Sequence, residues 1–299
     1  MEVRVVRCGD YRLRVTTWGH GSPHAVVLPG LSADARSLAP QIRELRRLYP
    51  SVHVIDLPGS AYRPALLVKD AKFSQLAEYV VAVMDAVGAG RATLVGHSLG
   101  GGVALHLALA HRERVESLVL IAPAALGRSL HWIYKLYCLP LIGRALLRPQ
   151  QQRMSKTFLR RFLVGSSRGH DDHFLELLIR HSSDSRDRAL TSRAIVWANQ
   201  PPWWKRVLLL LTPGGEQMAF SVIDRIDALD STPTLVLWGN EDRVICWRDA
   251  LRIKDHHERT EVHIARAMGH MLPLEAPAWT NERIRAFCQL RWPALDKAA

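Results

Sequence analysis

The sequence predicts an α/β protein whose sheet is mostly parallel and covered by helices on both faces. Short apolar runs alternate with stretches of helical periodicity through the first 126 residues and again after residue 222. Parallel strands need such crossover helices, and strands buried on both faces are apolar along their length. The composition, 48% hydrophobic and 23% charged over 299 residues, is typical of a globular chain that buries a sizeable core.

The first part of the chain opens with a predicted hairpin. The segments Val3–Arg7 and Arg12–Trp18 alternate with period two around Gly9-Asp10. Apolar runs then predict strands, and amphipathic stretches between them predict helices. We expect these strands at Ala25–Leu28, Val52–Ile55, Ala92–Val95 and Val115–Ile121, and the helices near 38–48, 73–87 and 100–111.

The alternation breaks between residues 127 and 222. Helical segments rich in Arg, Leu and Trp follow one another there with no clear strand. Beyond this stretch the strand and helix pattern resumes, so we predict one core formed by residues 1–126 and 223–299, with 127–222 inserted into it. The later strands are expected at Thr234–Trp238 and Glu261–Ala265, and the later helices near 246–256 and 277–290.

A serine stands at a sharp junction between a strand and a helix. Gly96-His97-Ser98-Leu99-Gly100 follows the strand expected at Ala92–Val95 and opens the next helix, which is a G-x-S-x-G pattern. Glycines on both sides lack the Cβ atoms that would collide with neighbouring backbone. Such a turn holds its serine in a strained conformation above the carboxyl end of the sheet, so Ser98 is the candidate nucleophile.

An acid and a base follow two later strands. A serine hydroxyl needs an imidazole to take its proton and a carboxylate to orient that imidazole. Asp242 comes just after the strand expected at Thr234–Trp238, and His270 just after the one expected at Glu261–Ala265. The chain order Ser98, Asp242, His270 is that of hydrolases with a nucleophile elbow.

Other titratable residues compete for these roles. Glu241 adjoins Asp242 and stays open as an alternative orienting acid. His97 lies inside the turn, where packing beside the sheet is favoured over a role as the base. No cluster has metal-ligand spacing, and no phosphate-binding or dinucleotide-binding glycine pattern is present. Three more histidines fall in a helix or strand typical of ordinary surface: His256, His257 and His263.

With Asp56-Leu57-Pro58-Gly59 added, these motifs resemble the α/β-hydrolase superfamily, in its lidded group with a Gly-x-x-Asp acid loop and a Gly-His loop. The resemblance covers about 1–126 and 223–290. It implies an eight-stranded, mostly parallel sheet, and a helical cap, residues 127–222, inserted after the sixth strand over the serine. It implies no metal or organic cofactor.

The resemblance also implies two backbone N–H groups that stabilise an oxyanion. One belongs to Leu99, the residue after the serine. The other follows the strand at Ala25–Leu28, where relatives usually carry His-Gly and this chain has Pro29-Gly30-Leu31, so Leu31 is assigned as the second donor. A proline that often follows the acid by a few residues is also missing here.

The residues favour a serine hydrolase, and we expect a carboxylic ester of a small or medium apolar substrate. Serine at the elbow argues against dehalogenases and epoxide hydrolases, which carry aspartate there. Carbon–carbon bond hydrolysis, lactone hydrolysis and acyl transfer stay open; carbon–carbon hydrolases usually show Asn before the serine and often Trp after the histidine, where this chain has His97 and Met271. A ligand-binding protein that keeps the hydrolase fold is the alternative without catalysis.

The formal net charge is +12, from 40 Lys and Arg against 28 Asp and Glu. The predicted cap alone carries 15 Lys and Arg against 6 Asp and Glu, so most of the excess belongs to it. We expect this charge to steer anionic substrates or to touch an anionic surface. Nucleic acid is not an expected partner, because no recognised nucleic-acid module is present.

Cysteine usage predicts the compartment. The four cysteines form no CxxC pair and are far too sparse for a disulfide-stapled domain. The opening residues do not resemble a secretory signal, and no apolar stretch is long enough to span a membrane. We therefore expect a cytoplasmic protein with reduced thiols.

Overall fold

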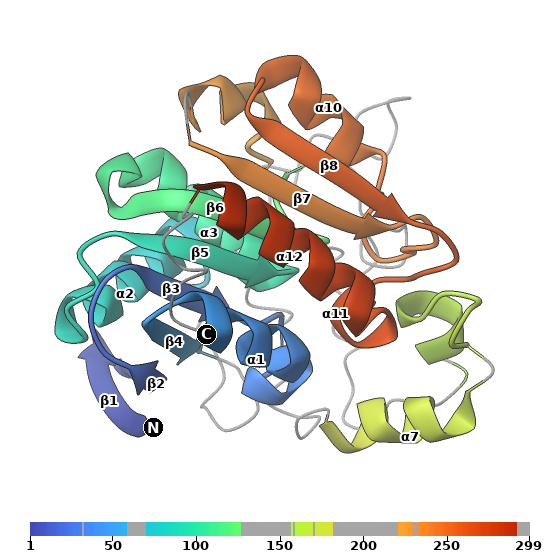
Figure 1. Ribbon diagram of the computed structural model, residues 1–299, viewed down its shortest axis with the longest axis horizontal. Coiled ribbons are helices and arrows are strands. Elements are labelled where there is room, and N and C mark those ends of the chain that lie inside the picture. The colour runs from blue at the N-terminus through green and yellow to red at the C-terminus, as the bar shows by residue number, and fades with distance from the viewer. Residues whose placement is uncertain are drawn as a thin grey trace, which may run out of the picture.

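The computed structural model describes residues 1–31, 33–58, 70–126, 157, 159–169, 171–181, 221–229 and 232–291. At its centre is the predicted eight-stranded sheet, with strand order β1-β2-β4-β3-β5-β6-β7-β8 (Figure 1). The opening hairpin, β1 (Glu2–Cys8) and β2 (Tyr11–Gly19), is antiparallel, and β2 also pairs antiparallel with β4. The strands that run parallel to one another are β3 (His24–Leu28), β4 (Ser51–Asp56), β5 (Ala92–His97), β6 (Val115–Ile121), β7 (Thr234–Gly239) and β8 (Thr260–Ala265).

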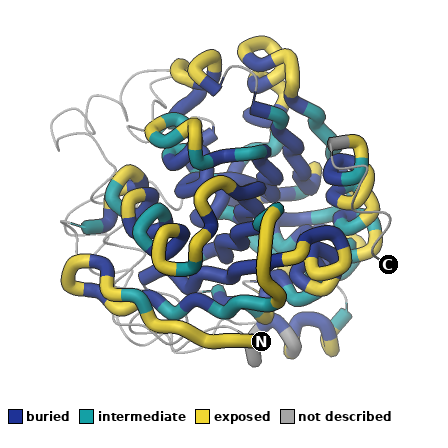
Figure 2. The backbone as a smooth tube through the Cα atoms, turned by 60° about the vertical axis from the view of Figure 1, so that its left-hand side comes forward, coloured by how far each residue is buried: buried dark blue, intermediate teal, exposed yellow. Residues whose placement is uncertain are grey.

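Helices cover both faces of this sheet, as the alternating pattern predicts. On one face α1 (Ala39–Leu48) and α12 (Pro277–Arg291) pack through one buried cluster, which includes Leu45 and Phe287. On the other face α2 (Phe73–Ala86), α3 (Leu99–Ala110) and α10 (Asp249–His256) pack through a second cluster. Figure 1 shows α12 crossing in front of the strands while α2 and α3 lie behind them. The central strands are buried throughout, whereas the edge strand β1 is exposed along most of its length (Figure 2).

Short elements connect the main ones. One of them, α11 (Leu272–Glu275), was not expected from the sequence, which predicts a single helix from about 277. Pro273 lies in the first turn of α11 and Pro277 begins α12, and proline is well tolerated only at such starting positions. Other connectors in the described part of the chain are the short 3-10 helices η1 (Ala35–Leu38), η3 (Arg112–Arg114) and η5 (Ile223–Leu229).

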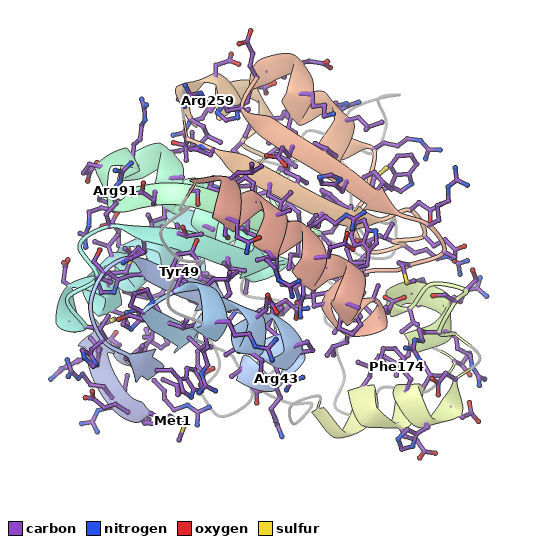
Figure 3. All side chains as sticks on the ribbon, in the orientation of Figure 1. Met1, Arg43, Tyr49, Arg91, Phe174 and Arg259 are labelled. Atoms are coloured by element: carbon purple, nitrogen blue, oxygen red, sulfur yellow. The ribbon has the colours of Figure 1, made fainter. Side chains whose placement is uncertain are left out.

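The predicted cap, residues 127–222, lies mostly outside the described residues. Its described parts are a turn of π-helix, η4 (Leu159–Leu163), the loop after it, and α7 (Asp172–His181), and they contain no strand. Phe174 lies on the side of α7 that faces η4 and α11 (Figure 3), in a small apolar cluster that also touches Met271 and Leu274. This part of the insertion therefore packs against the segment that follows β8.

The described helices and cysteines bear on two further expectations. None of these helices has the length and apolar character needed to cross a bilayer. No disulfide joins Cys8, Cys246 and Cys288, and Cys138 lies outside the described residues.

Candidate active site

Ser98 joins the end of β5 to the start of α3 in a strained conformation. Its φ of 52° and ψ of −116° lie where a residue with a side chain is rarely found. Backbone hydrogen bonds hold it there: its N–H donates to the Ile121 carbonyl over 3.0 Å, and its carbonyl accepts from Gly102 and Ala124 over 3.1 and 2.8 Å. The neighbouring strand β6 and helix α3 therefore fix the direction of the Ser98 side chain.

Glycines let the backbone segments around Ser98 approach closely. A Cβ at Gly96 would lie 2.6 Å from the backbone of Gly101, and one at Gly100 would lie 2.0 Å from the Leu28 carbonyl oxygen. No side chain fits at such distances, which explains the G-x-S-x-G pattern. A Cβ at Gly30 would lie 3.3 Å from the Cβ of Ser98, so the loop after β3 passes directly against this turn.

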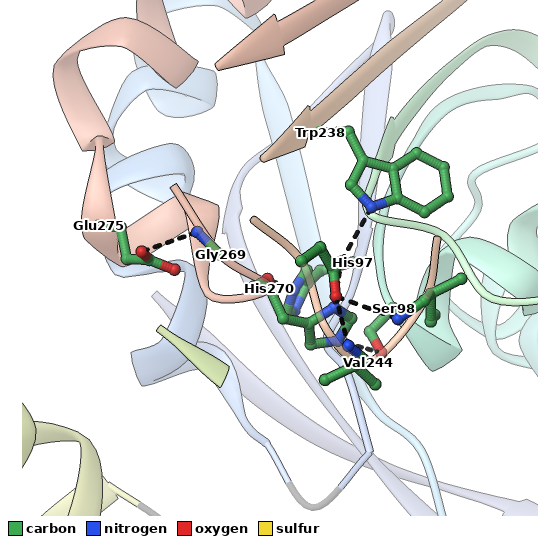
Figure 4. A network of polar contacts seen from close by, with 9 residues as sticks. His97, Ser98, Trp238, Val244, Gly269, His270 and Glu275 are labelled. Carbon is green, nitrogen blue, oxygen red and sulfur yellow. Dashed lines mark hydrogen bonds and ion pairs between the residues drawn. The ribbon is translucent and has the colours of Figure 1, made fainter. Parts of the chain in front are cut away.

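The three residues singled out from the sequence form one hydrogen-bonded chain (Figure 4). His270 Nε2 lies 2.9 Å from Ser98 Oγ, and His270 Nδ1 lies 2.8 Å from Asp242 Oδ2. The His270 and Asp242 side chains are 6% and 0% exposed. A neutral imidazole with its proton on Nδ1 donates to the carboxylate and leaves Nε2 free to accept the serine proton.

Asp242 is buried but fully supplied with donors. Its Oδ1 accepts from the backbone N–H groups of Val244 and Ile245 over 2.8 and 3.0 Å. Its Oδ2 accepts from Trp238 Nε1 over 2.9 Å in addition to His270. These bonds offset the cost of removing a carboxylate from water. The Trp238 contact was missed from the sequence, because a tryptophan at the end of a strand has the same pattern as any core residue.

Comparison with known proteins fits this geometry. The chain matches the alpha/beta hydrolase fold family over residues 23–277. It belongs to the α/β hydrolase family. It is 30% identical over 285 residues to a 2-hydroxymuconate semialdehyde hydrolase of Pseudomonas putida, a match that covers 91% of this chain and 89% of that one.

Two other proteins similar to this α/β hydrolase are named for different activities. The dihydrolipoyllysine-residue acetyltransferase component of the acetoin cleaving system of Pseudomonas putida is 28% identical over 273 residues. That match covers 90% of this chain but only 64% of the longer relative. A thermophilic esterase from Thermogutta terrifontis, solved with malate bound, superimposes with a TM-score of 0.72 at 20% identity, covering 97% of this chain and 98% of that one. The structural likeness supports the fold.

His97, weighed as a rival base, packs inside this α/β hydrolase. Its Nε2 donates to the backbone carbonyl of His270 over 3.0 Å, and its Nδ1 has no partner in the described part of the chain. Burial lowers the pKa of His97 to about 3, so the ring stays neutral. The structure thus places His97 beneath the loop that carries His270 and brings His270, not His97, to the serine.

Glu241, weighed as a rival acid, points away from the imidazole. Its two carboxylate oxygens accept from the backbone N–H and the hydroxyl of Ser166 over 2.7 and 2.8 Å. The adjacent Asp242 is the carboxylate that meets His270. Adjacent residues in this turn therefore serve different partners, which the sequence pattern does not distinguish.

The three histidines expected at the surface divide into two groups. His256 is exposed and lies 3.5 Å from Asp227, and His263 is half-buried and lies 3.9 Å from Glu261. His257 is buried, so it is a packing histidine and not a solvated one. Its Nδ1 lies 2.7 Å from Thr260 Oγ1, and this local bond closes the turn between α10 and β8.

Glu275, at the end of α11, is a buried carboxylate that the sequence did not reveal. Its Oε2 accepts from the N–H groups of Gly269 and Gly165 over 2.9 and 2.7 Å. Burial raises the pKa of Glu275 to about 7, and the N–H groups of Gly269, Gly165 and Met271, together with His270, oppose that rise. Figure 4 shows Glu275 on one side of His270 and Ser98 on the other.

Of the two residues assigned to the oxyanion hole, Leu99 follows Ser98 in the chain, and Leu31 follows a glycine that lies against Ser98. Leu99 is the first residue of α3, where the N–H has no acceptor within the helix. Leu31 is half-buried and follows Gly30, whose Cα faces the Ser98 side chain. Among the described residues, no group of three or more His, Cys, Asp or Glu side chains is placed to hold a metal ion.

Proposed function

We propose that this α/β hydrolase is a serine hydrolase that cleaves a carboxylic ester of a small or medium apolar substrate through an acyl-enzyme. The observation that carries the proposal is the pair of hydrogen bonds, 2.9 and 2.8 Å long, that link Ser98 through His270 to Asp242. The bond from Ser98 to His270 has the length that proton transfer between positioned groups requires, and the bond from His270 to Asp242 has the length of one that orients the imidazole.

In the proposed first step, Ser98 Oγ attacks the acyl carbon of the ester while His270 Nε2 takes the hydroxyl proton. The carbonyl oxygen of the substrate becomes an oxyanion, which the N–H groups of Leu31 and Leu99 stabilise. The imidazolium that forms lies against the ionised Asp242, which stabilises its charge without accepting its proton. His270 then gives the proton to the departing alkoxide, and the acyl group remains on Ser98.

In the second step a water molecule replaces the alcohol. His270 Nε2 takes a proton from this water, and the hydroxide formed attacks the acyl carbon on Ser98. Collapse of the second tetrahedral intermediate returns the proton to Ser98 Oγ and releases the carboxylic acid. An alcohol in place of water would give acyl transfer by the same residues.

Labelling with a fluorophosphonate tests the proposal. Such a reagent phosphonylates an activated serine with loss of fluoride, so the wild-type chain should gain one adduct at Ser98 and should hydrolyse p-nitrophenyl esters of short acids. Ser98→Ala is the matched control and should do neither. A wild-type chain that neither labels nor turns over these esters contradicts the proposal.

Carbon–carbon bond hydrolysis is the second candidate, and the relatives favour it. The 30% identical relative is named for 2-hydroxymuconate semialdehyde, and several others are named for related dienoates. His97 and Met271 stand where such hydrolases usually carry Asn and Trp, which favours ester cleavage. Comparing kcat/KM for 2-hydroxymuconate semialdehyde and for p-nitrophenyl acetate decides between the two, since the preferred substrate should lead by at least about tenfold, or 1.4 kcal/mol.

The proposed surroundings of the enzyme follow from its charge and its cysteines. We place it in the cytoplasm and assign the basic insertion, 127–222, to steering anionic substrates. Steering is screened by salt, so kcat/KM for an anionic ester should fall as ionic strength rises, while that for a neutral ester with the same acyl group should stay level. Equal salt profiles for the two esters would remove this role.

A further inference from the structure

The described part of the insertion binds the loop that carries His270. We call residues Leu159–Gly169 the strap and residues 266–271 the histidine loop. The carbonyl of Leu163 in the strap accepts from the N–H groups of His270 and Met271 over 2.9 and 3.1 Å. In return Ser167 N–H donates to the Ala267 carbonyl over 3.1 Å. The backbone of His270 is thus bonded directly to a segment from between β6 and β7.

The same strap binds both neighbours of Asp242. Ser166 donates twice to Glu241, and Arg243 Nη1 donates to the Arg161 carbonyl over 3.1 Å. We call the turn after β7 that carries Asp242 the acid loop. The strap is therefore hydrogen-bonded to the acid loop as well as to the histidine loop. Any displacement of the strap strains both loops.

Three glycines allow strap, histidine loop and acid loop to meet without side chains between them. A Cβ at Gly165 would lie 2.3 Å from the Ala267 carbonyl oxygen, and one at Gly269 would lie 2.5 Å from the Gly165 nitrogen. A Cβ at Gly239 would lie 2.3 Å from the Met268 carbonyl oxygen. Interiors packed this tightly transmit displacement instead of absorbing it.

Glu275 is hydrogen-bonded to both the strap and the histidine loop. A single oxygen, Oε2, accepts from Gly165 of the strap and from Gly269, the residue before His270. The side chain is 2% exposed, and its Oε1 has no partner among the described residues. A carboxylate in such a place is costly, and α11 alone does not need it. Its two hydrogen bonds to Gly165 and Gly269 join different chain segments, and the Met271 N–H and His270 also favour its charged form.

We infer that Glu275 is a positioning residue: by joining Gly165 to Gly269 it holds the His270 imidazole between Ser98 and Asp242, and it couples the strap to that imidazole. The inference rests on the proposed function, because it gives Glu275 a role through His270. It adds that the insertion influences catalysis through the strap, at the place where the strap contacts the histidine loop.

Positioning and simple stabilisation predict different kinetics. If Glu275 only stabilised the fold, removing it would lower the melting temperature and leave the folded molecules fully active. If it positions His270, folded molecules of a variant without Glu275 react slowly, because the imidazole acts in the transition state. The rate constant for reaction then falls while the constant for reversible binding stays level.

Inactivation by a fluorophosphonate measures both constants without knowledge of the natural substrate. The maximal rate constant of inactivation requires His270 to take the Ser98 proton, and the half-saturating concentration reports binding. For Glu275→Ala we expect the rate constant to fall about 100-fold, as for a misplaced catalytic group. The half-saturating concentration should change less than about twofold, because no binding group is removed.

Two further variants make the test specific. Glu275→Gln keeps an oxygen that can accept from both glycines, so it should recover most of the lost rate. Glu44→Ala is the matched control: Glu44 is also buried, and it binds Arg285 Nε over 2.7 Å at α12. It should lower the melting temperature and leave the inactivation rate constant unchanged.

Gly165→Ala keeps the inference falsifiable if Glu275→Ala does not fold. The added Cβ meets the Ala267 carbonyl and displaces the strap while Glu275 stays in place. It should reproduce the loss of rate without the loss of binding. Wild-type rate constants in either Gly165→Ala or folded Glu275→Ala overturn the inference.

Failure of the inference and failure of the proposed function leave different patterns. If the wild-type chain labels at Ser98, Ser98→Ala does not, and Glu275→Ala labels at the wild-type rate, the inference alone is overturned. If the wild-type chain does not label at all, the proposed function fails, and the positioning role falls with it.

Discussion

Two buried carboxylates lie near His270, and they are built in opposite ways. Asp242 uses both oxygens and accepts four hydrogen bonds, one of them from the imidazole itself. Glu275 uses one oxygen and accepts two, both from backbone N–H groups of glycines. One carboxylate meets the ring and the other meets the chain that carries it. The same functional group can therefore orient an imidazole directly or through its backbone.

The origin of the donors also differs between the two sites. Three of the four donors to Asp242 come from residues within four positions of it. One donor to Glu275, Gly165, is 110 positions away and belongs to the insertion. Apart from His270, the donors to Asp242 come from the end of β7 and the loop after it, whereas the Glu275 site needs the strap. The two regions should respond differently to the same kind of substitution.

The largest expected effect is at Asp242. Asp242→Asn keeps the size of the side chain but removes its charge and offers a donor to Nδ1, which favours the wrong tautomer of His270. We expect kcat/KM to fall about 10⁴-fold. The measurement is ester turnover, with Glu44→Gln as the control for loss of a buried carboxylate. A loss similar to that of Glu275→Gln would show that the two carboxylates do not differ in role.

A smaller effect is expected at Trp238. Trp238→Phe removes the N–H that donates to Asp242 Oδ2 and leaves the other three donors. Loss of a bond to a charged group costs about 1.5–3 kcal/mol, so we expect kcat to fall by about 10- to 150-fold. Trp279→Phe is the matched control, because this tryptophan of α12 is partly buried against the apolar cluster on the α1 and α12 face of the sheet, and the described contacts do not join it to Asp242. Equal kcat for both variants would contradict the role given to the Trp238 N–H.

The last expected effect is on the free energy of unfolding and its dependence on pH, through Glu275. Its pKa is raised from 4.5 to about 7 in the folded chain, so the folded state holds the proton more tightly than the unfolded state. The resulting stability is complete below the lower value and is lost as pH rises through the higher one. The free energy of unfolding of the wild type relative to Glu275→Gln should therefore fall by up to about 3 kcal/mol across that window.

Urea unfolding of both proteins at several pH values between the two limits measures this difference. If the difference in the free energy of unfolding between the two proteins does not change with pH, Glu275 is ionised throughout that range. Its environment would then differ less from that of Asp242 than its burial implies.

The positions of the candidate triad could be predicted because Ser98, Asp242 and His270 each lie in the loop or turn that follows a strand. Apolar runs place β5, β7 and β8 to within two residues at either end, and parallel strands bring their carboxyl ends to one edge of the sheet. Ser98, Asp242 and His270 therefore meet there. The hairpin, the parallel strands and the main helices follow from the same periodicity.

The supporting contacts could not be predicted, for physical reasons visible in particular residues. The bonds of Leu163 to His270 and of Glu275 to Gly165 join segments about 100 positions apart and leave no periodic trace. Glu275 itself has the pattern of an acidic residue at the start of a helix. The choice between Glu241 and Asp242 depends on which way each side chain leaves one turn, and only the fold decides that.

The bonding of the strap has a consequence for exchanging the cap. In a chimera that replaces the whole of residues 127–222 with the cap of another hydrolase, the donor at Gly165 and the acceptor at Leu163 would be lost together. Such a chimera would keep its sheet and its elbow, yet its histidine loop would lack both anchors. A cap should therefore be exchanged without Leu159–Gly169. This segment should stay with the core, because it anchors the histidine loop whichever cap is grafted.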